Sequence, residues 1–248
     1  MEKARKKLFD EYFSSIFSHS NVFSKKEFEN AYLQFEINYG NYISSQKDAK
    51  IMDIGCGTGH FLFYLEKKGY KNFLGIDISQ QQVNFCRDNV SKHVELADAF
   101  EFLKDKKNVY GVIAANDLLE HIPKGEINRF LKLVNNSLKS EGIFIMRTPN
   151  MGNPFSVYSR YKDFTHEAGY TDRSLYQVLW IAGFRDIQIL PYNRYFPRSL
   201  KRFIELKLAK IISFIIVKLF QIQGFVEPKI LTPLLIGVAK NNKKCEGK

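Results

Sequence analysis

The sequence predicts an α/β fold with an open, mostly parallel sheet and helices on both faces. Apolar runs of strand length alternate with helix-like stretches from about residue 50 to residue 190, a pattern typical of such sheets. The run at residues 109–115 is apolar at nearly every position, as expected for a strand that is covered on both faces. A loop with three glycines, at residues 53–59, follows the first apolar run, and glycine lets backbone turn sharply and approach a ligand.

The individual elements follow from local signals. We expect strands at residues 50–54, 72–76, 94–96, 109–115, 143–147 and 184–190. We expect helices at residues 60–68, 80–89, 100–103, 126–138 and 174–182. Gly69 and Gly183 end two of these helices, and Ser79 is placed to cap another.

The glycine loop and a later acidic residue indicate a nucleoside-containing cofactor. The loop reads Asp53-Ile54-Gly55-Cys56-Gly57-Thr58-Gly59, and Asp77 ends the second apolar run. Backbone N–H groups at the start of the next helix favour anionic groups, and a carboxylate at the end of the second strand can accept hydrogen bonds from ribose hydroxyls. The third glycine comes one residue too early for the dinucleotide motif, and the Gly-Lys-Ser/Thr end of a P-loop is absent.

These motifs resemble those of the class I S-adenosylmethionine (SAM) methyltransferases. The resemblance continues through Ala97-Asp98-Ala99, residues 110–121 and residues 138–146, and covers roughly residues 45–190 in order. It implies a Rossmann-like sheet of seven strands, with the last strand at residues 231–239. Glu141 stands where this family usually has Pro or Gly.

The resemblance also implies which residues hold the methionine part of SAM. Gly55, Gly57 and Gly59 would lie along it. Asp53 would anchor the loop and approach the amino group, and Asn116 would face the methyl region.

A second set would hold the nucleoside part. Asp77 would bind the ribose hydroxyls, and Ile78 would pack on the adenine. Asp98 would accept a hydrogen bond from the adenine amine, and Ala99 would offer its backbone N–H. Each aspartate could instead be a helix cap or a turn residue.

His166 and His121 are the candidate catalytic residues. His166 lies in the tract D-F-T-H-E, inside a non-repeating segment at residues 149–173 that crosses the carboxyl ends of the sheet, where an acceptor would lie. A neutral imidazole can act as a base near neutral pH, and Asp163 or Glu167 could orient it. The tract resembles one in methyltransferases of sugar and surface-polysaccharide biosynthesis. Alternatively, His166 braces its loop, and His121, after the fourth strand, is structural or lies near the cofactor.

Two further segments flank the repeating unit. Residues 1–46 are expected to form a helical cap, because aromatic residues recur at helical spacing from Phe9 to Phe17 and from Phe28 to Phe35. Ser24 is a candidate N-cap. The cap would cover the cofactor site, support the substrate site or only add packing. At the other end, residues 241–248 are polar and expected to form a flexible tail.

Residues 191–229 form an insertion before the last strand, with an expected amphipathic helix at residues 201–223. This helix is mostly aliphatic, and Lys207, Lys210 and Lys218 fall on one narrow stripe. Its apolar surface must be buried, either in the protein core, against a second copy in a homodimer, or at a membrane interface. Its charged residues argue against a membrane-spanning role.

Composition restricts the partners. The 248 residues carry a net charge of +11, which suits nucleic acid, an anionic membrane surface or a phosphorylated substrate, or serves only solubility. Nucleic acid is disfavoured because no separate binding module is visible. The tract Asn116-Asp117-Leu118-Leu119 also lacks the Pro-Pro-aromatic sequence of base-modifying methyltransferases.

The cysteines and the N-terminus predict the compartment. Cys56, Cys86 and Cys245 have no paired spacing, which indicates a reducing environment and no zinc site; the need for another metal stays open. The first residues lack the apolar core of a signal peptide. We therefore expect a cytoplasmic protein, located at the inner face of the membrane if residues 201–223 bind there.

Together these features predict a SAM-dependent methyltransferase. The favoured reaction is O-methylation of a sugar or glycan precursor, nucleotide-linked or lipid-linked, in cell-surface polysaccharide biosynthesis. One alternative acceptor is a lipid or quinone-like small molecule, favoured by residues 201–223, and another is RNA. A SAM-binding regulator without activity is the non-enzymatic alternative.

Overall fold

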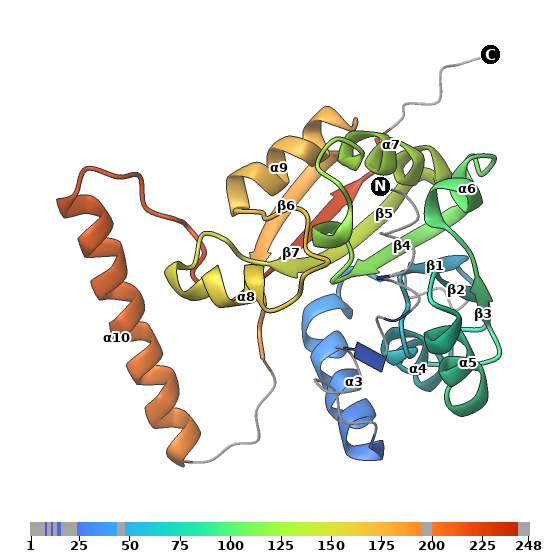
Figure 1. Cartoon of the computed structure of the whole chain (residues 1–248), viewed down its shortest axis with the longest axis horizontal. Coiled ribbons are helices and arrows are strands. Elements are labelled where there is room, and N and C mark those ends of the chain that lie inside the picture. The colour runs from blue at the N-terminus through green and yellow to red at the C-terminus, as the bar shows by residue number, and fades with distance from the viewer. Residues whose placement is uncertain are drawn as a thin grey trace.

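In a computed structural model of the chain, the fold is centred on a seven-stranded sheet with the strand order β3-β2-β1-β4-β5-β7-β6 (Figure 1). The structure describes residues 8, 11, 14, 15, 24–43, 48–194 and 200–242, apart from the side chain of residue 202. Strand β7 runs antiparallel to its neighbours β5 and β6, and the remaining pairs are parallel. The predicted mostly parallel, Rossmann-like sheet is confirmed.

The elements follow the predicted alternation. The strands are β1 (Ile51–Ile54), β2 (Phe73–Asp77), β3 (Val94–Leu96), β4 (Tyr110–Asn116), β5 (Leu138–Pro149), β6 (Arg185–Pro191) and β7 (Leu234–Lys240). The α-helices are α3 (Lys25–Tyr39), α4 (His60–Lys67), α5 (Gln80–Asn89), α6 (Ala99–Leu103), α7 (Ile127–Ser137), α8 (Val157–Tyr161), α9 (Asp172–Ile181) and α10 (Leu200–Ile222). Within the described ranges, two short 3₁₀ helices are η2 (Leu119–His121) and η3 (Pro154–Ser156).

Helices cover both faces of the sheet and enclose two core layers. Figure 1 shows α6, α7 and α9 on one side and α3, α4 and α5 on the other. Phe130 of α7 and Leu179 of α9 belong to one buried cluster, and Tyr39 of α3 and Leu62 of α4 belong to the second. Because both faces are covered, the central strands are apolar at nearly every position.

Side-chain caps fix several helix starts. The Ser24 hydroxyl accepts a hydrogen bond from Glu27 N at 3.2 Å, and the Ser79 hydroxyl accepts one from Gln82 N at 3.5 Å, so both predicted caps are confirmed. Helix α9 begins at Asp172 rather than at the expected residue 174. The reason is a capping box that starts at Thr171.

Strand β5 is longer than the predicted residues 143–147. Leu138 already pairs with Tyr110, and the register then shifts before Val112 pairs with Ile143. Glu141 lies in this irregular stretch with φ 59°, in the left-handed region that favours glycine. This conformation accounts for the Gly that the resemblance allows there, but not for Pro, whose ring fixes a negative φ.

The segment after β5 is joined to the segment before β7. The Asn150 side-chain amide donates to Ile230 O at 2.9 Å and to Thr232 O at 2.8 Å, and Asn153 Nδ2 donates to Leu231 O at 2.8 Å. Residues 230–232 are thus held outside the sheet, so β7 begins at Leu234 and not at the expected residue 231. The sequence reading also missed η3 and α8 within residues 149–173.

The ends of the chain differ partly from expectation. Asn241, expected to begin a flexible tail, is fully buried, and its side-chain amide donates to Asn135 O and Leu138 O at 3.0 and 2.9 Å. The remainder of the tail from residue 243 lies outside the described residues. Apart from residues 11, 14 and 15, the helix expected around Phe9 to Phe17 also lies outside them, whereas the one from Phe28 to Phe35 is confirmed as part of α3.

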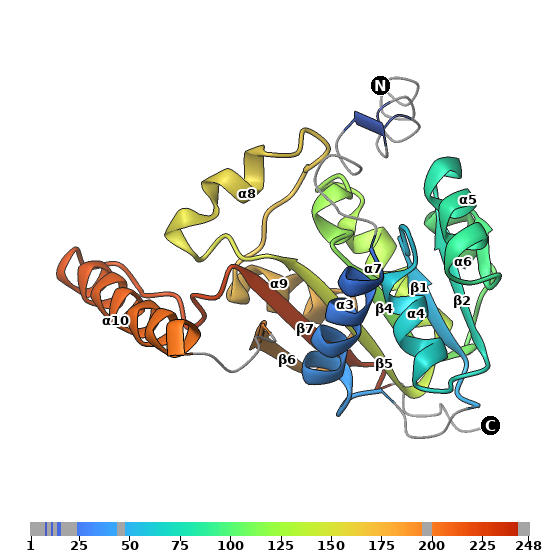
Figure 2. The ribbon, with the colours of Figure 1, turned by 90° about the horizontal axis from the view of Figure 1, so that it is seen from below.

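Helix α10 projects away from the sheet (Figures 1 and 2). Each of its side chains that the structure describes is exposed or half-buried, so the expectation that it could pack in the protein core is wrong. Within the described ranges, no helix combines the length and the apolar character needed to cross a membrane.

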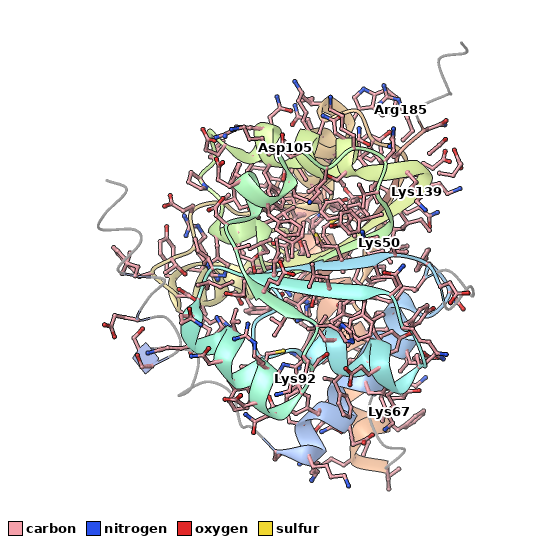
Figure 3. All side chains as sticks on the ribbon, turned by 90° about the vertical axis from the view of Figure 1, so that its right-hand side faces the viewer. Lys50, Lys67, Lys92, Asp105, Lys139 and Arg185 are labelled. Carbon is pink, nitrogen blue, oxygen red and sulfur yellow. The ribbon has the colours of Figure 1, made fainter. Side chains whose placement is uncertain are left out.

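Positive charge is spread over the outside of the molecule. Lys67, Lys92 and Lys139 come from three separate parts of the chain and are all exposed (Figure 3). The net charge of +11 is therefore not confined to one patch.

Candidate functional site

The carboxyl ends of the strands open into one cavity of about 1380 Å³. Asp53 of β1, Asp77 of β2, Asn116 of β4 and Arg147 of β5 line it, as ligand sites in open α/β sheets require. Side chains of α3 line the cavity as well, so the N-terminal cap contributes to the site. The predicted site residues also found in the lining are Gly55, Gly57, Ile78, Asp98, Ala99, His121 and His166. Gly59 is not among the lining residues, although Thr58 and His60 on either side of it are.

The three glycines of the loop adopt backbone conformations that other residues rarely reach. Gly55, Gly57 and Gly59 have φ angles of 68°, 54° and 91°, all in the left-handed region. A Cβ atom on Gly59 would lie 2.5 Å from Cys86 Sγ, closer than packing permits. Gly59 therefore allows the start of α4 to approach α5.

Asp77 fastens the glycine loop to the end of β2. Its Oδ2 accepts a hydrogen bond from Gly57 N at 2.9 Å, and its Oδ1 accepts one from Ser79 N at 2.8 Å. Burial raises the pKa of this carboxyl, and the backbone hydrogen bonds oppose that rise. A carboxylate oxygen can accept more than one hydrogen bond, so these contacts are compatible with further binding to ribose hydroxyls.

Buried polar atoms without a partner mark the deep part of the cavity. Among the residues that the structure describes, Asp53 Oδ1, Gln82 Oε1 and Asn116 Nδ2 are buried and make no hydrogen bond that meets the distance and angle limits, although the Asn116 side chain is near enough to Asp53 to lower the pKa of that carboxyl. Buried polar atoms are normally satisfied, so these atoms indicate a polar ligand. Two acceptor oxygens and one amide donor suit the ammonium and carboxylate groups of an amino acid, such as the methionine part of SAM.

The surroundings of Asp53 disfavour its ionised form. Burial raises the pKa of Asp53 well above its ordinary value, and the nearby Asp77 carboxyl raises it further. An ammonium group beside Asp53 would favour its ionised form.

Asn116 is held by a residue that sequence reasoning missed. The hydroxyl of Tyr39, a fully buried residue of α3, donates to Asn116 Oδ1. Tyr39 is 77 positions away from Asn116 in the sequence. Its local sequence is that of an ordinary aromatic residue of a helix, so no local signal could identify its role in the site. Next to Asn116, Asp117 has φ 52° and accepts a hydrogen bond from Arg147 Nε at 3.0 Å.

Two exposed apolar side chains line another part of the cavity. Ile78 is 43% exposed and Leu96 is 48% exposed, and both line the cavity. Asp98 lies close by in sequence and caps α6 by accepting hydrogen bonds from Phe100 N at 2.8 Å and Glu101 N at 3.2 Å. The capping role considered for Asp98 is thus present. Leu96 was missed, although its place at the end of the third strand is a usable signal.

His121 and His166 form a close pair in the cavity wall. Both are buried, and their ring centroids lie 4.8 Å apart at an interplanar angle of 68°. His121 belongs to η2 after β4, and His166 to the segment after α8. The fold thus brings together two histidines that the sequence analysis proposed as separate catalytic candidates.

Hydrogen bonds fix the orientation of both imidazoles. His166 Nδ1 lies 2.9 Å from Ser159 O, and His121 Nδ1 lies 2.8 Å from Thr165 Oγ1. The Thr165 hydroxyl in turn donates to Asp163 Oδ1 at 2.6 Å, so its oxygen accepts from His121. Because a carbonyl can only accept, His166 Nδ1 donates. In the neutral form of each ring, Nε2 then holds the lone pair.

The surroundings keep both histidines neutral near pH 7. Burial is the main cause for each: it lowers the pKa of His121 to about 4, with help from His166, and it lowers the pKa of His166 below its ordinary value. Burial, followed by the Asp117 charge, raises the pKa of the neighbouring Glu120 to about 8. These three side chains are therefore mostly uncharged at neutral pH.

Of the two acidic residues proposed to orient His166, Asp163 is the one that lies beside it. Asp163 Oδ2 is 4.0 Å from His166 Nε2, and both residues are buried, whereas Glu167 is exposed. Arg160 donates to the backbone carbonyls of His166 and Glu167, so its guanidinium braces this loop.

Glu120, His121 and His166 are also the group that could hold a metal ion within the described part of the chain. Their candidate ligand atoms all lie within 4.8 Å of one another. Imidazole nitrogens and a carboxylate oxygen suit several divalent metals. Ligand atoms around a tetrahedral zinc are roughly 3.3 Å apart, so metal binding would require these side chains to move closer.

Comparisons with known proteins agree with this geometry. A family model described as a methyltransferase domain matches residues 38–189. The carboxy-S-adenosyl-L-methionine synthase of Nautilia profundicola is 30% identical over 181 residues, which are 68% of this chain and 74% of that enzyme. The ubiquinone biosynthesis O-methyltransferase of Pelagibacter ubique is 32% identical over 108 residues, 42% of this chain and 43% of that enzyme.

The fold itself also has solved relatives. The crystal structure of a SAM-dependent methyltransferase from Archaeoglobus fulgidus superposes with a TM-score of 0.63 at 24% sequence identity, covering 94% of this chain and 98% of that one. The seven-stranded sheet is therefore shared with a SAM-dependent enzyme. The family match covers more than half of the sequence, and its cofactor fits the unpaired atoms of the cavity. The chain belongs to the methyltransferase domain family and is a SAM-dependent methyltransferase.

Proposed function

We propose that this enzyme methylates a hydroxyl group of a sugar or glycan precursor, carried on a nucleotide or a lipid, in cell-surface polysaccharide biosynthesis. The observation that carries this proposal is the buried His121–His166 pair in the same cavity as the glycine loop. A hydroxyl must lose its proton as it attacks, and a positioned imidazole is well suited to take that proton. Amine or thiolate acceptors would need less help.

His166 is the proposed general base. Its Nδ1–H is engaged by Ser159 O, so Nε2 is the atom that would take the acceptor proton. Its lowered pKa keeps it unprotonated at neutral pH. His121 would hold the acceptor hydroxyl or the His166 ring in place, with the orientation set by Thr165 and Asp163.

SAM, when bound, supplies a methyl group on a positively charged sulfur. We infer that Asp53, Gln82 and Asn116 bind its amino-acid end, where Gly55, Gly57 and Gly59 shape the loop. Gln82 is added to the predicted set because of its unpaired Oε1.

At the nucleoside end, Asp77 would bind the ribose hydroxyls, and the adenine would lie between the apolar side chains of Ile78 and Leu96. Asp98 and the Ala99 backbone N–H would bind the edge of the adenine. Asp98 has one oxygen, Oδ1, in the cap of α6, which leaves Oδ2 for this contact.

Two observations favour an anionic, sugar-containing acceptor. Lys162 and Arg194 line the cavity, and their charge suits the phosphate groups of a nucleotide-linked or lipid-linked sugar. The D-F-T-H-E tract that carries His166 also resembles one in methyltransferases of sugar metabolism. Cys56 and Cys86 are buried free thiols, consistent with the proposed cytoplasmic location, and Cys245 lies outside the described residues.

A lipid or quinone-like acceptor is the second candidate. The similarity to a ubiquinone biosynthesis O-methyltransferase and the exposed apolar surface of α10 favour it. An RNA acceptor has weaker support, because it rests only on the net positive charge.

Product identification tests the proposal. The full chain is incubated with methyl-labelled SAM and, separately, with nucleotide sugars, lipid-linked sugars, quinols and RNA, and products are identified by mass spectrometry and NMR. We expect a labelled methyl group on a sugar oxygen. Label on a quinol or lipid alone would support the second candidate, and label on a nitrogen or carbon atom would contradict O-methylation.

A further inference from the structure

Helix α10 exposes an unusually large apolar surface. It is a helix of 23 residues that stands apart from the sheet in both ribbon views (Figures 1 and 2). Phe214 is 62% exposed and Ile222 is 80% exposed. The other large apolar side chains exposed on this helix are Leu200, Phe203, Ile204, Leu206, Leu208, Ile211, Ile212, Ile215 and Leu219. A surface of this kind marks a contact with a partner or a membrane.

From residue 206 to residue 222, the charged groups of α10 form a narrow stripe, whereas Lys201 and Glu205 in the first two turns lie on the opposite side of the helix. At 3.6 residues per turn, Lys207, Lys210 and Lys218 lie within about 80° of the helix circumference. The apolar side chains between residues 206 and 222, apart from Phe214 on the stripe, spread over about 240°. Ser213 falls within this arc, and its hydroxyl donates to Ala209 O at 2.9 Å, so it needs no partner from outside the helix.

A second apolar segment lies at the same edge of the molecule. Within η3, α8 and the following loop, the exposed side chains are Phe155, Val157, Tyr158, Tyr161 and Phe164, the last 85% exposed. Both views show α8 and α10 extending to the same side (Figures 1 and 2). The hydrogen bonds from Asn150 and Asn153 to residues 230–232 join the chain before η3 to the chain after α10.

We propose that α10 and the η3–α8 segment together form a surface that docks on an anionic lipid bilayer, with α10 lying in the plane of the interface. The apolar arc would enter the acyl boundary, and the lysine stripe would face the headgroups and water. Each lysine near an anionic leaflet adds to the electrostatic attraction. Tyrosine side chains such as Tyr158 and Tyr161 are well suited to the boundary between apolar and wet regions.

A second copy of the chain fits these observations less well. The contact between two helices uses a narrow apolar seam, whereas the arc on α10 is several times wider. Two chains that each carry a charge of +11 also repel one another, and an anionic surface attracts both.

Docking would place the cavity next to the bilayer. Tyr158 and Lys162 belong to the η3–α8 segment and its following loop and also line the cavity, so the lipid-facing segment is one wall of the candidate site. The acceptor would then be attached to a lipid. This last step rests on the proposed function, but the docking itself does not.

Vesicle co-sedimentation of the full chain without SAM or acceptor tests the docking. We expect binding to vesicles of phosphatidylglycerol and phosphatidylethanolamine at low salt and at least tenfold weaker binding to phosphatidylcholine vesicles. The variant with Ile211→Ser, Ile215→Ser and Leu219→Ser should bind at least tenfold more weakly. The variant with Lys207→Gln, Lys210→Gln and Lys218→Gln should lose most of the salt dependence. Retained SAM binding would confirm that each variant is folded.

Two results would overturn the proposal. One is no binding of the unmodified chain to anionic vesicles at low salt. The other is a dimer in solution, detected by light scattering, that the serine substitutions convert to a monomer while vesicle binding stays unchanged. A failed methylation assay would contradict the proposed function and leave these binding results intact.

Discussion

The cavity has two walls that are built in different ways. The cofactor wall consists of the glycine loop at residues 53–59 with the ends of β2 and β3, and each part follows directly after a strand. The acceptor wall consists of Glu120 and His121 with residues 157–166, and contacts between distant parts of the chain hold it together. His121 and Thr165, for example, are 44 positions apart. The cofactor wall thus follows mainly from short motifs at strand ends, and the acceptor wall from contacts between distant segments.

This difference leads to separable effects of mutation. Changes in the cofactor wall should disturb the loop and SAM binding, because its residues set backbone conformation. Changes in the acceptor wall should disturb turnover, because its residues set the orientation and protonation of two imidazoles.

The largest expected effect comes from Gly59→Ala, with Gly69→Ala as its matched control. Both glycines have a left-handed φ, 91° and 81°, but a Cβ on Gly59 meets Cys86 Sγ at 2.5 Å while one on Gly69 meets nothing within 4 Å. We expect Gly59→Ala to lower the free energy of unfolding by about 1–3 kcal/mol more than Gly69→Ala, and to weaken SAM binding. Urea denaturation and calorimetric titration measure the two effects. Equal losses in both variants would show that the contact with α5 is unimportant.

A smaller effect is expected from Thr165→Val in the acceptor wall. Valine keeps the shape but cannot accept from His121 Nδ1 or donate to Asp163, so the ring loses its fixed orientation. We expect kcat to fall roughly tenfold, about 1.4 kcal/mol, with SAM affinity unchanged. Thr165→Ser should restore most of the rate. If Thr165→Ser failed to restore kcat, the hydroxyl at position 165 would not be the group that matters.

The smallest expected effect is a shift in pH dependence. His166 must be unprotonated to act as a base, and burial lowers its pKa, so kcat/KM should stay high as pH falls and decline only below about 6.5, the ordinary histidine value. The Asp163 charge raises the pKa of His166; Asp163→Asn should therefore move the acidic limb to still lower pH. If the acidic limb of the pH profile moved to higher pH in this variant, the assignment of His166 as the base would be contradicted.

The sequence was most informative where one residue determines local geometry. Ser79 as a cap, Asp53 and Asp77 at strand ends, and the loop glycines could all be found from type and spacing, because each stands at the end of a strand or at the start of a helix. Tyr39, which binds Asn116 from 77 positions away, could not be found, because its role depends on how α3 packs.

The same reasoning explains the errors outside the site. Residues 231 and 232 look like strand because they begin an apolar run, yet the side chains of Asn153 and Asn150 hold their carbonyls. Asn241 looks like the start of a polar tail, yet two buried carbonyls accept its amide protons. In both cases a hydrogen bond over about 80 to 100 positions outweighs local preference.

One paired measurement tests the central claim that binding and turnover reside in separate walls. SAM affinity and the single-turnover rate at saturating SAM are measured for Asp77→Asn and His166→Ala, with His93→Ala as an exposed control and His166→Gln to keep the side-chain volume. We predict that Asp77→Asn loses affinity and recovers its rate at saturating SAM. Both His166 variants should keep their affinity within about twofold and lose about 10²-fold or more in rate, with His93→Ala unchanged. Equal loss of affinity and rate in both His166 variants would contradict the account.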